Sequence, residues 1–177
     1  MSLIKIFKNA SFTARAVCIV LAVLVVLSLF VRHPYFIIRN THTNEVLFAT
    51  GFPEGESFSI SYIHSLHQTP VTEGYKRYNG ELVLDYVEFE SLGAGLPDIL
   101  EYGQTLTHLE DGGMRIDGFH RLIPDLHILI GHTTYHTLHI ADQNVLLESL
   151  DHPGQSLHFA FCQFNIWQRL YYRILLR

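Results

Sequence analysis

Histidine is the residue type of this chain with the most obvious capacity for chemistry. Twelve histidines occur among 177 residues, and histidine is both a common metal ligand and the side chain that titrates closest to neutral pH. The tightest spacings are His64-x-x-His67 and the set His132, His136 and His139. Residues three apart on one strand point to opposite faces, whereas a metal site needs ligands that converge. The pattern therefore predicts scattered surface histidines, with no metal and no cofactor.

The sequence also gives little support for catalysis by a nucleophile or by paired carboxylates. Ser65 follows His64 directly, and neighbouring side chains on a strand diverge, so the pair does not make a nucleophile and its base. The carboxylates in the same region have no spacing that favours acid–base work over simple solvation. These carboxylates are Glu73, Asp85, Glu88 and Asp98. We therefore expect no catalytic residues.

Two glycine- and polar-rich segments are better suited to binding. The first runs from His64 to Glu73, and the second reads Gly93-Ala94-Gly95-Leu96-Pro97. Glycines around an alanine, closed by a proline, permit positive φ and close approach of a backbone, as ligand-cradling loops require. A tight crossover between sheets is the simpler explanation and stays open.

The hairpin between these two segments predicts that they meet. The strand Val71–Tyr78 leads to a two-residue turn at Asn79-Gly80, and the strand Glu81–Glu90 returns to the starting edge. We expect His64, Ser65, Thr69, Pro70 and Glu73 to lie at one end of the domain, together with Gly93–Pro97.

Charge is segregated along the chain. All 17 acidic residues lie between Glu45 and Asp151, and residues 33–163 contain only five basic ones, which gives this section a net charge of −12. Such a body repels phosphate backbones, so the sequence argues against nucleic-acid binding. Basic ends that flank an acidic body suit a protein held at a membrane by its ends.

The N-terminal region predicts a membrane anchor. Residues 16–31 read AVCIVLAVLVVLSLFV and carry no charge, and a helix of about 20 apolar residues spans a bilayer. We expect one transmembrane helix near residues 13–31. A cleaved signal peptide is the alternative, but the run ends in Ser28-Leu29-Phe30-Val31, which fits a cleavage site poorly.

Basic residues before the apolar run set the expected topology. Lys5, Lys8 and Arg15 precede or begin it with no acidic residue among them, which places the N-terminus in the cytoplasm. We therefore expect a single-pass protein of the cytoplasmic membrane, with its main domain in the periplasm or outside the cell. The expected parts are a stub and anchor over 1–32, a β domain over 33–163 and a C-terminal helix over 164–177.

The exported part has the pattern of a mainly β domain. Its short runs rich in β-branched and aromatic residues are bounded by turn residues, which predicts a small antiparallel β-sandwich or barrel-like domain. Ser57–His64 alternates, with Phe58, Ile60 and Tyr62 on one face. The other expected strands are 35–39, 71–78, 81–90, 105–109, 114–116, 127–130, 136–140, 145–148 and 157–161.

The last thirteen residues change to a helical period. Ile166, Trp167, Leu170 and further apolar residues share one face, while Arg169, Arg173 and Arg177 share the other. A basic amphipathic helix with a tryptophan is typical of a membrane or partner interface. Docking on the sheet explains the pattern equally well.

The binding segments also carry a resemblance. The patterns Ser61-Tyr62-x-His64-Ser65, Thr69-Pro70-Val71-x-Glu73 and Gly93-Ala94-Gly95-Leu96-Pro97, with a later Arg121 and a final strand, resemble the family catalogued as domain of unknown function eighteen-fifty. The resemblance covers roughly residues 35–163. Members are often encoded beside TAXI-type TRAP transporters, which import organic acids and similar solutes using a periplasmic binding protein.

The resemblance implies a transport-linked accessory protein of the cell envelope, without an established activity. We therefore expect a membrane-anchored accessory or binding module whose partners are a TRAP-type transporter subunit, membrane lipids and a small carboxylate solute. The alternative is a metal-dependent or hydrolytic envelope enzyme that uses the histidine-rich β domain. A metal analysis of the exported domain separates the two.

Overall fold

The computed structural model describes residues 12–65, 68–90 and 99–176. These residues divide into two compact units. One unit comprises residues 34–162 and holds the β domain, and the other combines residues 12–33 with residues 163–175.

The smaller sheet of the β domain has four strands in the order β2-β1-β11-β8. It brings the two ends of the domain together, because β1 and β11 are neighbours although more than a hundred residues separate them. Their bounds are β1 His33–Asn40, β2 Val46–Gly51, β8 Leu126–Leu129 and β11 Ser156–Phe164.

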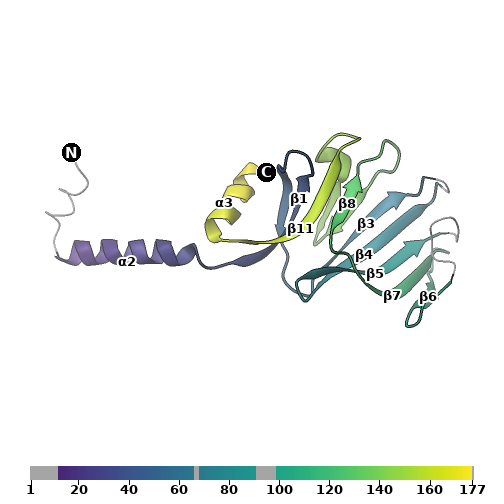
Figure 1. The fold of residues 1–177 in the computed structure, drawn as a ribbon, viewed down its shortest axis with the longest axis horizontal. Coiled ribbons are helices and arrows are strands. Elements are labelled where there is room, and N and C mark those ends of the chain that lie inside the picture. Colours follow the sequence, from purple (N-terminus) through teal and green to yellow (C-terminus); the bar gives the residue numbers. More distant parts are fainter. Residues whose placement is uncertain (1–11, 66–67, 91–98, 177) are drawn as a thin grey trace. The chain divides into compact units, whose positions relative to one another are not determined.

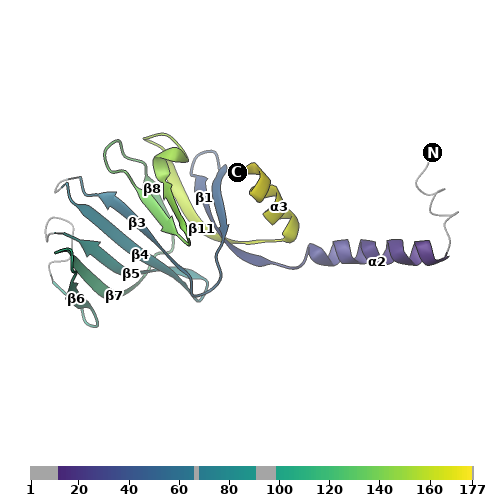
Figure 2. The ribbon, with the colours of Figure 1, turned by 180° about the vertical axis from the view of Figure 1, so that it is seen from behind.

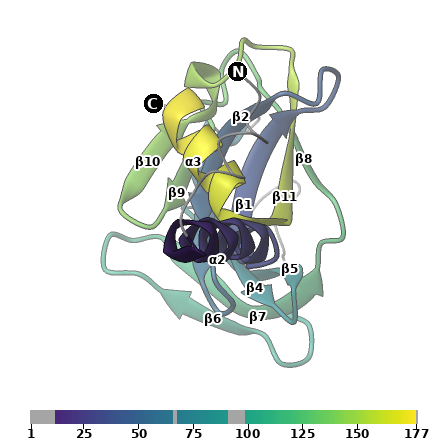
Figure 3. The same ribbon diagram turned by 90° about the vertical axis from the view of Figure 1, so that its left-hand side faces the viewer.

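The larger sheet has seven strands in the order β10-β9-β3-β4-β5-β7-β6. Strands β9 and β10 form one edge of it, and β6 and β7 lie at the other (Figure 3). A short 3-10 helix, Leu147–Ser149, follows β10. The strands are β3 Ser57–Ile63, β4 Pro70–Tyr78, β5 Glu81–Phe89, β6 Thr105–His108, β7 Met114–Leu122, β9 Thr137–Ile140 and β10 Gln143–Leu146.

The two sheets form two layers (Figure 1, and from behind in Figure 2) that share one hydrophobic core. Phe36 and Ile38 of β1 and Phe58 and Ile60 of β3 are almost completely buried in it. These residues alternate with more exposed ones because side chains of a strand point to opposite faces in turn. The expected mainly antiparallel β domain is confirmed.

The hairpin predicted at Asn79-Gly80 is also confirmed. Strands β4 and β5 pair from Tyr78 opposite Glu81 to Val71 opposite Phe89, with one shift of register between Gly74 and Tyr75. Asn79 and Gly80 adopt φ of 53° and 79°, which is the conformation that two-residue hairpin turns require.

Strands β2 and β7 differ most from the sequence expectation, and Leu147 and Glu148, which were expected in a strand, lie in the 3-10 helix that follows β10. Strand β2 was not predicted, and it pairs with β1 at the edge of the smaller sheet. Strand β7 runs to Leu122 instead of ending at Ile116. Gly118 and His120 have positive φ where the pairing with β5 is shifted, so a bulge lets the strand continue past Gly118.

The described chain has a helix at each end. The C-terminal helix α3, Ile166–Leu175, starts with a reciprocal cap. The Asn165 side chain accepts from the Gln168 amide N–H at 2.9 Å, and the Gln168 side chain accepts from the Asn165 N–H at 3.0 Å.

The N-terminal helix α2, Phe12–Ser28, has 17 residues. It ends where the amides of Leu29 and Phe30 bond carbonyls only three residues back, while the Ser28 hydroxyl donates to the Val25 carbonyl at 2.6 Å. Over the residues that the structure describes, no helix combines the length and the apolar character needed to cross a membrane. This corrects the expected transmembrane helix at residues 13–31.

On the outer face of the larger sheet, the ring of Tyr86 packs directly against Gly74. A Cβ at Gly74 would lie 2.0 Å from the Tyr86 ring. The Arg115 guanidinium covers that ring at 3.6 Å from its centroid and pairs with Glu88 at 3.0 Å and Asp117 at 2.8 Å. The ring therefore cannot move aside without losing this stack.

We predict that Gly74→Ala destabilises the protein by about 1–3 kcal/mol through overpacking. Thermal unfolding of the full chain in detergent measures this as a lower Tm. The matched control is Gly51→Ala, because an added Cβ there meets nothing within 4 Å. Equal Tm values for the two variants would contradict the role of the Gly74–Tyr86 contact.

Candidate functional site

The first predicted binding segment is the turn from β3 to β4. The His64 amide donates to the Thr69 carbonyl at 2.9 Å, and the Gln68 amide donates to the His64 carbonyl at 2.8 Å. Ser65 is exposed and Pro70 begins β4. The Thr69 hydroxyl is buried and has no hydrogen-bond partner among the described residues, which makes it available to a ligand that reaches it.

The second predicted segment, Gly93–Pro97, lies outside the described residues. The register of β4 and β5 nevertheless indicates where this segment begins. Val71 pairs with Phe89, so the chain leaves β5 at the edge where the 64–69 turn enters β4. The convergence of Gly93–Pro97 with that turn stays a prediction.

Glu73 lies on the inner face of the larger sheet, where it is half-buried. It is flanked along β4 by Val71 and Tyr75, which are buried at 1% and 4% exposure. Tyr62 donates its hydroxyl proton to Glu73 Oε1 at 3.2 Å, and Tyr75 donates to Oε2 at 2.5 Å. A carboxylate in such a place needs donors, because an unpaired buried charge is costly.

The two tyrosines are held in their protonated state. Burial is the main cause that raises the pKa of both Tyr62 and Tyr75, and the charge of Glu73 and its hydrogen bonds raise these pKa values further. The positive charge of Arg121 acts in the opposite direction on the pKa of Tyr75. The structure thus brings the predicted residues Glu73 and Arg121 to the same tyrosine.

A cavity of about 280 Å³ borders Glu73 between the two sheets. Tyr62, His136 and residues 126–129 of β8 also line it. The rings of Tyr62 and His136 are 5.3 Å apart, and burial lowers the pKa of His136. The cavity therefore presents a carboxylate, a phenol and a neutral imidazole beside apolar walls.

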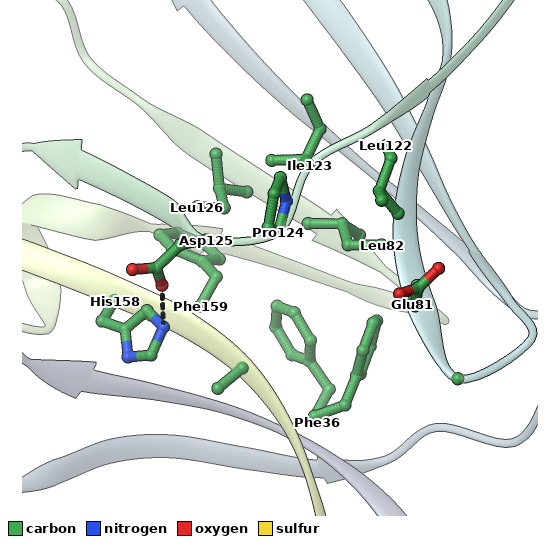
Figure 4. Close-up of a pocket in the computed structure, with 13 residues that line it drawn as sticks. Phe36, Glu81, Leu82, Leu122, Ile123, Pro124, Asp125, Leu126, His158 and Phe159 are labelled. Atoms are coloured by element: carbon green, nitrogen blue, oxygen red, sulfur yellow. Dashed lines mark ion pairs between the residues drawn. The ribbon is translucent and has the colours of Figure 1, made fainter.

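A second cavity, of about 380 Å³, opens between the sheets near the β4–β5 hairpin (Figure 4). Apolar side chains make most of its wall, among them Phe36, Leu82 and Phe159. Asp125 and His158 are paired beside this wall, with Asp125 Oδ1 at 2.7 Å from His158 Nε2.

Asp125 belongs to a cluster with His127 and His158. His127 Nε2 lies 3.1 Å from Asp125 Oδ2, and the two imidazole rings stack with centroids 4.5 Å apart and planes 10° from parallel. Arg39 Nε donates to His158 Nδ1 at 2.9 Å. Arginine cannot accept, so His158 carries its own proton on Nε2 and donates it to Asp125.

This cluster is where the described residues come closest to a metal site. The ligand atoms of Asp125, His127 and His158 lie within 4.8 Å of one another. A metal on His158 Nε2 would place the imidazole proton on Nδ1, where Arg39 already donates. Nearly parallel rings also aim their lone pairs side by side. A cation would therefore have to displace Arg39 and rotate the rings.

The histidine spacings noted in the sequence do not form such a cluster. His139 is hydrogen-bonded to Ser61 and Asn144, both at 2.7 Å, whereas His136 bonds Thr134 at 3.1 Å. His67 lies outside the described residues.

The predicted interface residues lie on α3. The Trp167 indole donates to the Ser28 hydroxyl of α2 at 3.0 Å. Arg173 is exposed on the helix and Arg169 is half-buried, and Arg177 lies outside the described residues.

A comparison with protein families gives a match over residues 58–147 to the family described as "Domain of unknown function (DUF1850)". The chain belongs to the DUF1850 family. The matched range contains the whole Glu73–Tyr62–Tyr75 cluster, Arg121 and His136, whereas Arg39 and His158 lie beyond its ends. No curated protein and no solved structure matches the chain.

In this DUF1850 chain the sequence reasoning missed the two tyrosines as partners of Glu73. The sequence of β4 contained a signal for this. Glu73 lies two positions from both Val71 and Tyr75, so its side chain points to the same face of the strand as theirs. For the Asp125 cluster there was no signal, because His127 and His158 lie 31 positions apart in the sequence.

We predict that the DUF1850 chain loses stability between pH 7.5 and 5.5, in part through His158. Burial is the main cause that lowers the pKa of His158, followed by the charge of Arg39, and Asp125 and His127 also act on it. The unfolded state, with a pKa of about 6.5, therefore binds more protons than the folded state. Stability is present above that pH and is lost as pH falls below it.

The measurement is Tm at both pH values for the wild type and for His158→Asn. We expect the variant to lose less Tm on acidification, even where its Tm at pH 7.5 is already lower. His42→Asn removes an exposed histidine as the control. An unchanged pH dependence in His158→Asn would contradict the prediction.

Proposed function

We propose that this DUF1850 protein is a membrane-attached, extracytoplasmic accessory or binding module that works with a TRAP-type (TAXI) solute transporter. The observation that carries the binding role is the cavity of about 280 Å³ between the sheets, with Glu73 and Tyr62 in its wall. A concave, partly apolar site with a few convergent polar groups is the usual form of a binding pocket.

Binding is favoured over catalysis by the way the polar groups are already paired. Both oxygens of Glu73 accept hydroxyl protons, and the pKa values of these tyrosines are raised, so neither phenol is a ready base. His158 has both nitrogens engaged, one by Arg39 and one by Asp125. These groups are arranged to hold a shape and to offer hydrogen bonds.

The charge of the β domain bears on what it binds. A net charge of −12 over residues 33–163 opposes long-range attraction of a free anion. We therefore rank a transporter subunit above a small carboxylate solute as the ligand. A partner segment with donor groups would add hydrogen bonds at Glu73 and at the Thr69 hydroxyl, which has no partner among the described residues.

The apolar surface of α2 supports attachment to the cytoplasmic membrane. Ile19, Leu21 and Leu24 are each 56% exposed, and the apolar run continues beyond the helix to Val31. Water exposure of this much apolar surface is unfavourable, and lipid removes it. We propose that residues up to Val31 attach the chain to the membrane, with the β domain outside.

The second candidate function is a metal-dependent or hydrolytic envelope enzyme. The Asp125–His127–His158 cluster is the specific observation that favours it. Metal analysis of the purified full chain separates the two candidates, because stoichiometric metal that is lost in Asp125→Asn would favour the enzyme.

We predict that Glu73→Gln weakens the functional interaction while the protein stays folded. A hydrogen bond to a charged group contributes about 1.5–3 kcal/mol, so we expect roughly ten- to hundred-fold weaker binding. The measurement is co-purification of the full chain with the membrane subunit of a TAXI-type transporter from the same cell, together with solute uptake.

The control for this prediction is Glu101→Gln, which makes the same chemical change on an exposed side chain. We expect it to bind as the wild type does. Unchanged co-purification and uptake in Glu73→Gln, and unchanged uptake after deletion of the gene, would remove the transport role.

For the topology, we predict that a reporter active only in the cytoplasm stays silent when fused after Arg177. The physical reason is the set of basic residues Lys5, Lys8 and Arg15 on the N-terminal side. The same reporter fused before Lys5 serves as the positive control. Full activity after Arg177, or recovery of a chain trimmed near residue 31, would overturn the proposed localisation.

A further inference from the structure

A groove of about 340 Å³ lies between α2 and α3, which belong to the same compact unit. Its walls are Leu21, Leu24 and Val25 of α2 and Ile166, Trp167 and Leu170 of α3. The three α3 residues are each about half exposed. The free energy falls when a hydrocarbon chain replaces water against apolar walls of this kind.

Two hydrogen bonds fix how the helices meet at the groove. The Trp167 indole donates to Ser28 Oγ at 3.0 Å, and Arg32 Nη1 donates to Gln168 Oε1 at 3.3 Å. Trp167 therefore lies level with the end of α2. Tryptophan in membrane proteins concentrates at the depth of the lipid head groups, so this level corresponds to the interface.

The two segments that carry the groove are basic. Arg32 lies just beyond α2, and Arg169 and Arg173 lie on α3, whereas every acidic residue of the chain falls between Glu45 and Asp151. An anionic head group would find only positive side-chain charge along these two segments. A second copy of the chain would bring the same positive charge and be repelled.

We propose that the groove between α2 and α3 binds the acyl chain of an anionic phospholipid, whose head group is attracted by the positive charge of these two segments. The inference rests on the proposed attachment to a membrane and deepens it by assigning a lipid class. Its consequence is that α3 lies along the outer interface instead of remaining a free tail, and that lipid composition governs how firmly the two helices associate.

Trp167 allows a direct test, because it is the single tryptophan of the chain. The full-length protein is reconstituted into vesicles in which either phosphatidylglycerol or phosphatidylcholine carries brominated acyl chains, both lipids being present in each sample. Bromine quenches tryptophan fluorescence only on close approach. We expect stronger quenching by brominated phosphatidylglycerol.

Variants separate the charge from the apolar groove. We expect Arg169→Gln and Arg173→Gln to weaken the preference for phosphatidylglycerol about fivefold each, with Lys76→Gln as a control that removes a positive charge from the β domain. Leu170→Asn should reduce quenching by both lipids while circular dichroism reports unchanged helix content.

Two further outcomes separate a failure of the lipid site from a failure of membrane attachment. Equal quenching by the two brominated lipids in protein that co-floats with vesicles would overturn the anionic-lipid site and leave membrane attachment standing. Failure of the protein to co-float with either kind of vesicle would overturn the attachment itself, and the lipid site with it.

Discussion

The carboxylate of Glu73 on the inner face of a β-sheet is the constraint on which the site depends. The pairing of β4 with β3 and β5 turns Glu73 toward the opposite sheet, in line with the buried Val71 and Tyr75. A charge in that position is tolerated only with hydrogen-bond donors. Tyr62 and Tyr75 supply them, and the space that these polar groups keep open between the sheets is the cavity.

Two polar networks of the β domain differ in what they leave available. Around Asp125 the groups satisfy one another, because His158 donates to the carboxylate and accepts from Arg39. A network whose members pair with one another in this way is suited to stabilising the contact between strands of the smaller sheet. The Glu73 network faces a cavity, and carboxylate oxygens have further lone pairs for a ligand. The binding role therefore belongs with the second network.

Much of the fold could be predicted from the sequence because it depends on local chemistry. Alternation along residues 57–63 set the buried face of β3, and Asn79-Gly80 set the hairpin, since both follow from the conformational preferences of neighbouring residues. The helical period from Ile166 gave α3, and its cap at Asn165 is also local. The motifs from Ser61 to Glu73 were specific enough to indicate the DUF1850 family.

The tertiary structure decided what comes together. Pairing of β8 with β11 places His127 opposite His158, and no pattern in the sequence connects residues so far apart. The end of α2 at Ser28 depends on the bonds that its last turn makes, which the uniform apolar run to Val31 does not reveal. Hydrophobic pattern fixes which face of a strand or helix is buried, whereas strand neighbours fix which polar groups meet there, and that choice is made by packing over the whole domain.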